Sequence, residues 1–266
     1  MNATTVGQSP DRTPGKHALL NQLLGREVGA YQHSFLRHHP RYHIDLCAGD
    51  GHPTDSSHTS SPTIFQDHTT YLRQKMVRVD LVLIEKAANT FGALQANTQP
   101  HPHTTLVHGD SRDPGVVPRF PANPNTSVFI HNDPNSIHHF ALTPELVDRL
   151  PKHTTVLCTL GCNVGSLKRL PEEDRAGWYH HVNTVTGMMA KHHDALLIAL
   201  NNDASQWAYL ITGPTKWQNR YRKDADRAFA KWSKGITYYQ YRTQRHQFDD
   251  LCDQLFRTKA ERQAAS

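Results

Sequence analysis

The stretch YHIDLCAGDG (residues 42–51) passes from an apolar, strand-like segment into two glycines and two carboxylates. The spacing Asp45-x-x-x-Gly49-x-Gly51 is typical of a turn after a strand in which glycines take positive φ and let a ligand approach the backbone. A short motif of this kind also fits a strand that simply ends in a loop. The choice between the two interpretations depends on the rest of the chain.

Acidic residues follow three further strand-like segments. Residues 79–84 are mostly apolar and run into Glu85, residues 104–107 run into Gly109 and Asp110, and residues 126–131 run into Asn132-Asp133-Pro134. In a doubly wound α/β fold, the carboxyl ends of parallel strands share one edge, and ligands bind there. The acids in register therefore favour a nucleotide-type cofactor turn over a plain loop.

Strand-like and helix-like segments alternate along the chain. Strands are predicted at 42–47, 79–84, 104–107, 126–131, 154–160, 194–200 and 206–212, with the last two paired as a hairpin. Helices are predicted at 17–38, about 64–74, 87–96, from Thr143 onward, and at 173–191. Alternation of this kind predicts a Rossmann-like, doubly wound α/β/α fold. Its seven-stranded sheet would be mostly parallel, with a C-terminal antiparallel hairpin strand.

The predicted organisation has three parts: a flexible tail at 1–16, the α/β domain at 17–215, and a basic helical extension at 216–266. The 266 residues, 37% of them hydrophobic, suffice for one large domain or two small ones. No apolar run approaches the roughly 18 residues that span a bilayer, and the N-terminus lacks the apolar centre of a signal peptide. We expect a cytoplasmic protein without membrane contact.

The four cysteines and 20 histidines do not follow the spacing of a metal site. Cys158-x-x-x-Cys162 has the wrong gap for a zinc knuckle and lacks a second pair. The histidines lack the helical i, i+4 spacing of a metallopeptidase. We expect neither a disulfide framework nor a metal, and we interpret most histidines as solvated polar positions.

The formal net charge of +5 suggests an anionic partner, and the location of the charge is more informative. Residues 216–234 interleave basic and aromatic side chains. The basic groups could reach phosphates while the aromatics stack on bases, or the segment could be an amphipathic helix with an aromatic core face. The candidate nucleic-acid contacts are Lys216, Arg220, Arg222 and Lys223.

The run IDLCAGDG…SSPTIF…LVLIEK…HGDSRD…FIHNDPN resembles class I S-adenosylmethionine-dependent methyltransferases over roughly residues 17–215. Within that superfamily it looks like the three-Cys-motif partner proteins and, more distantly, DNA amino-methyltransferases. The resemblance implies that Glu85 accepts hydrogen bonds from the ribose hydroxyls and that Asp110 accepts from the adenine amino group. The implied S-adenosylmethionine site comprises Asp45, Cys47, Gly49, Gly51, Glu85, Lys86, Asp110 and Ser111.

Two features distinguish the sequence from common nucleotide folds. Forty residues separate Asp45 from Glu85, where such folds usually need about 20. The spacing G-x-G-x-x-G is also absent. Both features argue against a nicotinamide cofactor, and an insertion here is expected of the partner-protein family.

Amino-group methyltransferases carry Asp/Asn-Pro-Pro-aromatic after the fourth strand, and here the stretch is Asn132-Asp133-Pro134-Asn135. The resemblance assigns catalysis to Asp133 or Asn132 with the Pro134 carbonyl, which would accept from the target NH2. The second proline and the aromatic are missing, and an Asx-Pro turn explains the same residues without any catalysis. His131, His138 or His139 could act as a general base for an oxygen or protonated-amine target, although a polar surface role is the simpler interpretation for each of them.

The sequence thus predicts a methyltransferase for an amino group of nucleic acid, most plausibly adenine N6 in DNA. Two alternatives remain open. One is a methyltransferase for a small molecule or protein. The other is a non-catalytic module that binds the cofactor or nucleic acid in a defence or mobile-element system. The oligomeric state is not indicated.

Overall fold

The computed structural model describes residues 13–32, 35–52, 60–113, 115–134, 142–160, 180, 183–190, 193–200, 207–231, 233 and 235–247. Within these residues the chain forms a single mixed sheet in the order β3-β2-β1-β4-β5-β7-β6-β8. The strands are β1 Arg41–Asp45, β2 Asp80–Glu85, β3 Thr104–His108, β4 Ser127–Asn132, β5 His153–Leu160, β6 Asp194–Leu200, β7 Trp207–Gly213 and β8 Ile236–Gln240.

The first five strands pair in parallel. β7 then pairs antiparallel with both β5 and β6. This is the predicted Rossmann-like α/β arrangement with its antiparallel hairpin strand. The described sheet has eight strands rather than the predicted seven, because β8 adds to the outer side of β6 in antiparallel register. β8 lies in the segment that was predicted to be a helical extension.

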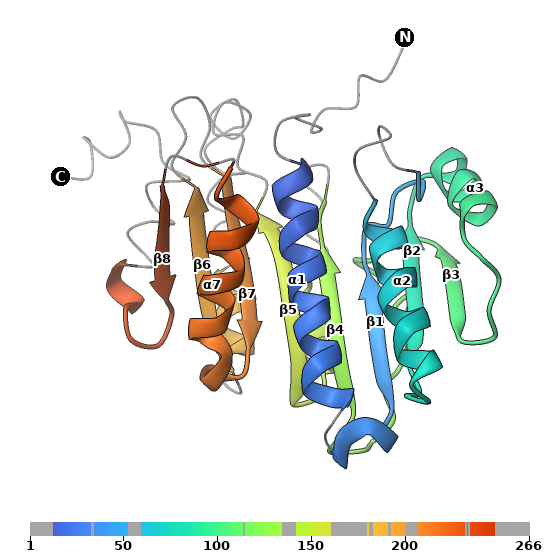
Figure 1. The fold of residues 1–266 in the computed structure, drawn as a ribbon, viewed down its shortest axis with the longest axis horizontal. Helices are drawn as coiled ribbons and strands as arrows, with labels where there is room; N and C mark the ends of the chain where they lie inside the picture. Colours follow the sequence, from blue (N-terminus) through green and yellow to red (C-terminus); the bar gives the residue numbers. More distant parts are fainter. Residues whose placement is uncertain are drawn as a thin grey trace, which may run out of the picture.

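Helices cover both faces of the sheet. The helices are α1 Thr13–Gln32, η1 Phe35–His38, α2 Ser61–Gln74, α3 Ala88–Asn97, α4 Pro144–Asp148, η3 Thr215–Trp217 and α7 Gln218–Phe229; residues 183–189 are also helical. Figure 1 shows α1, α2 and α7 side by side across one face. Their apolar residues pack on that face in one core cluster, and α4 and residues 183–189 contribute to a second cluster on the other face.

α1 begins at Thr13, four residues earlier than predicted, so Lys16 lies in the helix and not in a tail. The Thr13-Pro14-Gly15 sequence indicated a flexible segment. Proline is nevertheless compatible with the first turn of a helix, where its missing N–H is not needed. This earlier start places Lys16 and His17 beside the carboxyl end of β4, as described below.

α1 also buries a carboxyl group against the sheet. Glu27 is 5% exposed, and Thr155 Oγ1 donates to its Oε1 at 2.8 Å. Burial raises the pKa of Glu27 to about 7, although the Thr155 hydrogen bond and the charge of Arg41 act in the opposite direction. Arg41 is itself buried in β1 and donates from Nε to Ser127 Oγ at 3.1 Å.

α7 packs on α1 and on the sheet through its aromatic residues. Tyr221 and Phe229 are each 1% exposed, and Trp217 is 9% exposed. The ion pair between Arg26 of α1 and Asp224 of α7, at 2.5 Å, closes the helix–helix contact. These three aromatics are therefore core anchors, as the amphipathic-helix interpretation predicts, and the base-stacking alternative is wrong for them. An aromatic spacing near one helical turn fits either role until burial is known.

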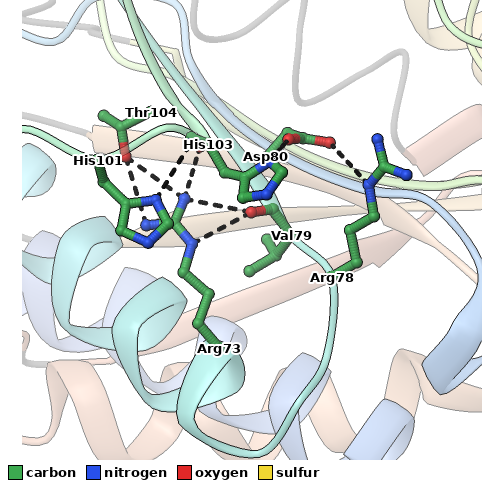
Figure 2. A network of polar contacts seen from close by, with 7 residues as sticks. All are labelled: Arg73, Arg78, Val79, Asp80, His101, His103 and Thr104. Atoms are coloured by element: carbon green, nitrogen blue, oxygen red, sulfur yellow. Dashed lines mark hydrogen bonds and ion pairs between the residues drawn. The ribbon is translucent and has the colours of Figure 1, made fainter.

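Figure 2 shows a polar network that joins α2 to the beginnings of β2 and β3. The guanidinium of Arg73, at the end of α2, donates to the carbonyls of Val79 and His103 at 3.2 and 2.6 Å. His103 also contacts Asp80 through Nδ1 at 2.8 Å. One arginine thus fixes the far end of α2 to two neighbouring strands.

No helix within the described ranges is long and apolar enough to cross a membrane.

Candidate functional site

The turn after β1 has the backbone geometry that its glycines allow. Gly49 and Gly51 have φ of +69° and +73°, a region that other residues rarely adopt. A Cβ at Gly51 would lie 3.2 Å from Leu94 Cδ1 of α3, whereas one at Gly49 would meet nothing within 4 Å. Gly51 therefore serves the packing of α3, and the side of Gly49 is open for a ligand.

Glu85, the last residue of β2, holds this turn in place. Gly49 N–H donates to its Oε2 at 2.9 Å, and Ala87 N–H donates to its Oε1 at 2.8 Å. The carboxylate thereby connects the turn after β1 to the turn before α3. β1 and β2 end side by side, with Asp45 opposite Leu83, so Glu85 lies two residues further along this edge than Asp45.

Asp110, just after β3, is surrounded by two cations. Lys86 Nζ lies 2.9 Å from its Oδ2, and Arg112 contacts the same oxygen at 2.5 Å. The hydrogen bond from Arg112 is the main cause that holds the pKa of Asp110 far below its ordinary value, and Lys86 adds to it. Ser111, the adjoining residue of the predicted site, is buried.

Asp45 ends β1 in a buried polar cluster. Its Oδ1 lies 3.1 Å from His131 Nδ1, and both side chains are fully buried. Since a carboxylate oxygen accepts, His131 donates from Nδ1 to Asp45. His131 Nε2 and Asp45 Oδ2 have no hydrogen-bond partner among the described residues. The expectation that His131 occupies a polar surface position was wrong, because β4 is a central strand with both faces covered.

Asp133 follows β4, and the ammonium group of Lys16 donates to its Oδ2. Burial alone raises the pKa of Asp133, but the charges of Lys16 and His131 outweigh it, so the pKa lies below its ordinary value. His17, next to Lys16, also lies close to Asp133 and His131. Burial and the Lys16 charge lower the pKa of His17 to about 4, so its ring is neutral at pH 7.

Asn132 points to the opposite face of β4 from His131. Its Nδ2 donates to Cys158 Sγ at 3.7 Å, and Cys47 Sγ donates to its Oδ1 at 3.9 Å. Asn132 is fully buried, and burial raises the pKa of the Cys47 thiol well above its usual range. The Asn132 side chain thus contacts the two cysteines, whereas the Asp133 side chain contacts Lys16. Pro134, also buried, directly follows Asp133.

The four basic residues predicted to contact nucleic acid lie away from Asp133. β7 runs antiparallel, and its last residue, Gly213, pairs with Asp194 at the start of β6. Lys216 therefore lies at the amino edge of the parallel strands, whereas Asp133 lies at the carboxyl edge. α7 rises from that edge over about 18 Å and carries exposed Arg220 and Lys223.

Arg222 is only half-exposed, since its guanidinium lies 5.6 Å from the Tyr238 ring centroid.

Sequence reasoning identified the acids of the site and missed Lys16, His17 and Arg112. A signal existed only for Arg112, which follows Asp110 by two residues. Within the described part of the chain, no group of three or more His, Cys, Asp or Glu residues could hold a metal ion. His138, His139 and Cys162 lie outside the described residues.

No family model matches the sequence, and no curated protein matches it. Several solved structures resemble the chain at low identity. A Legionella pneumophila protein described by the family model DUF519 is 13% identical, with 86% of this chain and 96% of that chain covered and a TM-score of 0.49.

Precorrin-6y C5,15-methyltransferase from Geobacter metallireducens is 11% identical, with 78% and 91% covered and a TM-score of 0.39. The fibrillarin pre-rRNA processing protein of Methanococcus jannaschii is 11% identical, with 68% and 70% covered and a TM-score of 0.37. At these values the likeness concerns the path of the chain, and no residue role is taken from it.

Proposed function

We propose that this chain transfers a methyl group from S-adenosylmethionine to an amino group. The observation that carries the proposal is the contact of Glu85 with the Gly49 N–H at the carboxyl edge of a mixed sheet in which β7 is antiparallel. It places an acid at the end of β2 against an open glycine turn after β1. This is the arrangement that the resemblance to class I methyltransferases implies for the ribose of the cofactor.

The residues fit the cofactor in three respects. Each oxygen of Glu85 accepts one backbone N–H, and a carboxylate oxygen has capacity for a second donor such as a ribose hydroxyl. The open side of Gly49 would accommodate the methionine part. Asp45 Oδ2 is a buried acceptor with no partner in the described residues, and a cationic ammonium would complement it directly or through a turn residue.

Asp110 could bind the adenine of the cofactor if Lys86 and Arg112 leave room for it. Asp110 already accepts from Lys86 and Arg112, so an adenine amino group would share this carboxylate with two cations. Lys86 is 56% exposed and Arg112 is 39% exposed, so both can turn toward solvent at low cost. The Asp110 carboxylate would then be ionised and able to accept from the adenine amino group of the cofactor.

The chain's own residues would prepare the acceptor. S-adenosylmethionine supplies a methyl group on a cationic sulfur: the acceptor nitrogen forms the new C–N bond as the C–S bond breaks, and its electrons remain on sulfur. Asp133 would accept one N–H of the acceptor and afterwards receive the proton released from nitrogen. The carbonyl of Pro134 is a second candidate acceptor, which would orient the nitrogen lone pair toward the methyl carbon.

The finer assignment is adenine N6 in DNA, on a chain of the three-Cys-motif partner type. Its support is the Asp133-Pro134 step after β4, at the same edge of the sheet as Asp45, Glu85 and Asp110. One observation favours a second candidate, a methyltransferase whose acceptor is not a nucleic acid. Lys216 and Arg220 lie toward the edge of the sheet away from Asp133, so a bound polyanion would not reach both places easily.

Calorimetry tests cofactor binding. We expect S-adenosylhomocysteine to bind the wild type, and Glu85→Gln to weaken binding by about 1.5–3 kcal/mol, since a charge-assisted acceptor is lost. Glu145→Gln, an exposed glutamate in the first turn of α4, is the matched control and should bind normally. Absence of heat in the wild type, or equal affinity in all three proteins, would contradict the cofactor assignment.

Transfer of tritium from labelled S-adenosylmethionine tests the acceptor. Label in DNA that digests to N6-methyladenine would support the finer assignment, and Asp133→Asn should remove it while cofactor affinity persists. The control is Asp148→Asn, an exposed residue of α4. Label confined to small molecules or protein would transfer support to the second candidate. Binding without any transfer would indicate a non-catalytic cofactor-binding module.

A further inference from the structure

The first turns of α1 place an amine on the residue proposed to bind the acceptor. Lys16 and Asp133 are 117 residues apart in sequence, and the ammonium donates to Asp133 Oδ2. The two side chains are only 18% and 15% exposed. A nitrogen of this chain therefore already occupies the hydrogen-bonding position that an acceptor nitrogen would need.

The chemistry of Asp133 limits what can replace Lys16 productively. Its carboxylate is ionised at neutral pH, because neighbouring positive charge lowers its pKa. An ionised carboxylate stabilises an alkyl ammonium in its protonated form, and that form has no lone pair with which to attack a methyl group. An NH2 group on an aromatic ring is neutral at pH 7, can donate an N–H to the carboxylate, and keeps a lone pair.

We propose that Lys16 fills the acceptor subsite until it is displaced by a neutral NH2 group on a planar ring, which makes Lys16 a residue that determines specificity. The proposal rests on the proposed function and deepens it. Alkyl amines such as protein lysines would bind Asp133 as Lys16 does, in an unreactive state.

The surrounding groups support displacement rather than permanent pairing. Asp45 and His131 both lie close enough to His17 to affect its pKa, and His131 also contributes to the lowered pKa of Asp133. His17 Nδ1 and His131 Nε2 are buried and have no partner within the described residues. His131 uses Nδ1 for Asp45, so Nε2 is the atom through which a neutral His131 ring would accept from a displaced ammonium or from an incoming N–H.

A binding experiment tests displacement without requiring turnover. The probe is a fluorescein-labelled single-stranded oligodeoxynucleotide containing adenine, titrated by anisotropy in the presence of S-adenosylhomocysteine. If the pair is closed about nine-tenths of the time, Lys16→Met should tighten binding about tenfold, because the competent fraction rises toward one. Lys16→Arg keeps the charge and should bind like the wild type.

Lys75→Met, which removes an exposed lysine at the end of α2, controls for net charge. An oligonucleotide with purine in place of adenine lacks the amino group and should not discriminate Lys16→Met from the wild type.

Three results would overturn the proposal. Weaker or unchanged binding of the adenine probe by Lys16→Met would show that Lys16 does not compete for the subsite. Loss of S-adenosylhomocysteine binding in Lys16→Met, with Lys16→Arg intact, would place Lys16 in the cofactor site instead. Mass spectrometry that found a methyl group on Lys16 after incubation with S-adenosylmethionine would show that an alkyl amine is a competent acceptor.

The proposed function has its own refuting result, which is that the wild type binds no cofactor in calorimetry. In that case the anisotropy comparison, made without cofactor, still decides whether Lys16 occludes Asp133.

Discussion

Replacing Glu27 with glutamine should change how the stability of the protein depends on pH. Glu27 lies on the buried side of α1 and is 5% exposed. Its pKa rises from 4.5 to about 7, with burial as the main cause. A shift of this size corresponds to about 3 kcal/mol of stability.

The sign follows from proton binding. Below pH 4.5 the carboxyl is neutral in both the folded and the unfolded states. Between pH 4.5 and 7 the unfolded chain loses the proton while the folded chain keeps it, so the free energy of unfolding falls as pH rises. Glutamine is neutral throughout and keeps an oxygen that can accept from Thr155, so Glu27→Gln should lack this loss.

Urea unfolding, followed by tryptophan fluorescence at several pH values from 4.5 to 8, measures the difference. We expect wild type and Glu27→Gln to be about equally stable near pH 4.5, and the variant to be more stable by about 3 kcal/mol above pH 7. Glu145→Gln, at an exposed position, should follow the wild type. A pH-independent difference, or a less stable variant at pH 8, would mean that Arg41 holds the Glu27 carboxylate ionised in the fold.

Three further predictions concern the turn, the C-terminal helix and the central strands. Gly51→Ala should destabilise the fold by about 1–3 kcal/mol in urea unfolding, because its positive φ and the contact with Leu94 both oppose a Cβ; unchanged stability would refute this. Trp217→Ala should cost about 3 kcal/mol, whereas Arg220→Gln should leave the melting temperature nearly unchanged. His43→Leu should raise stability by about 1 kcal/mol and weaken the loss of stability below pH 6.5, because both ring nitrogens are buried without partners in the described chain. Burial depresses the pKa of this histidine in the fold, so the wild type should unfold at a higher pH than the variant during acid titration followed by circular dichroism. Identical acid transitions in the two proteins would contradict the prediction.

The acids of the candidate site were predictable because each lies at the end of a strand or within two residues of it. Glu85 and Asp110 follow short apolar runs, and parallel strands bring such ends to one edge whatever the length of the connections. The insertion between Asp45 and Glu85 therefore did not obscure their relation. The pattern could not predict which cations contact these acids. The partners of Asp110 depend on the directions in which the side chains of Lys86 and Arg112 point.

Lys16 was not predictable. Its partner is 117 residues away, and a Thr-Pro-Gly sequence fits a tail as well as a helix start. β8 was missed for a related reason. The run Ile236-Thr237-Tyr238-Tyr239 has the β-branched and aromatic composition of a strand, but it follows a basic helical segment whose pattern was continued through it.

Glu85 and Lys16 have contrasting consequences for the kinetics of the proposed reaction. The Glu85 carboxylate is already fixed by Gly49 and Ala87, so the cofactor would meet a preorganised surface, and its arrival need not await any rearrangement. The acceptor must wait for the Lys16–Asp133 pair to open, so its observed association rate should reach a plateau at high concentration. Stopped-flow traces would then show two kinds of concentration dependence. The observed rate of cofactor binding would rise in proportion to cofactor concentration, whereas that of acceptor binding would level off at the rate at which the pair opens.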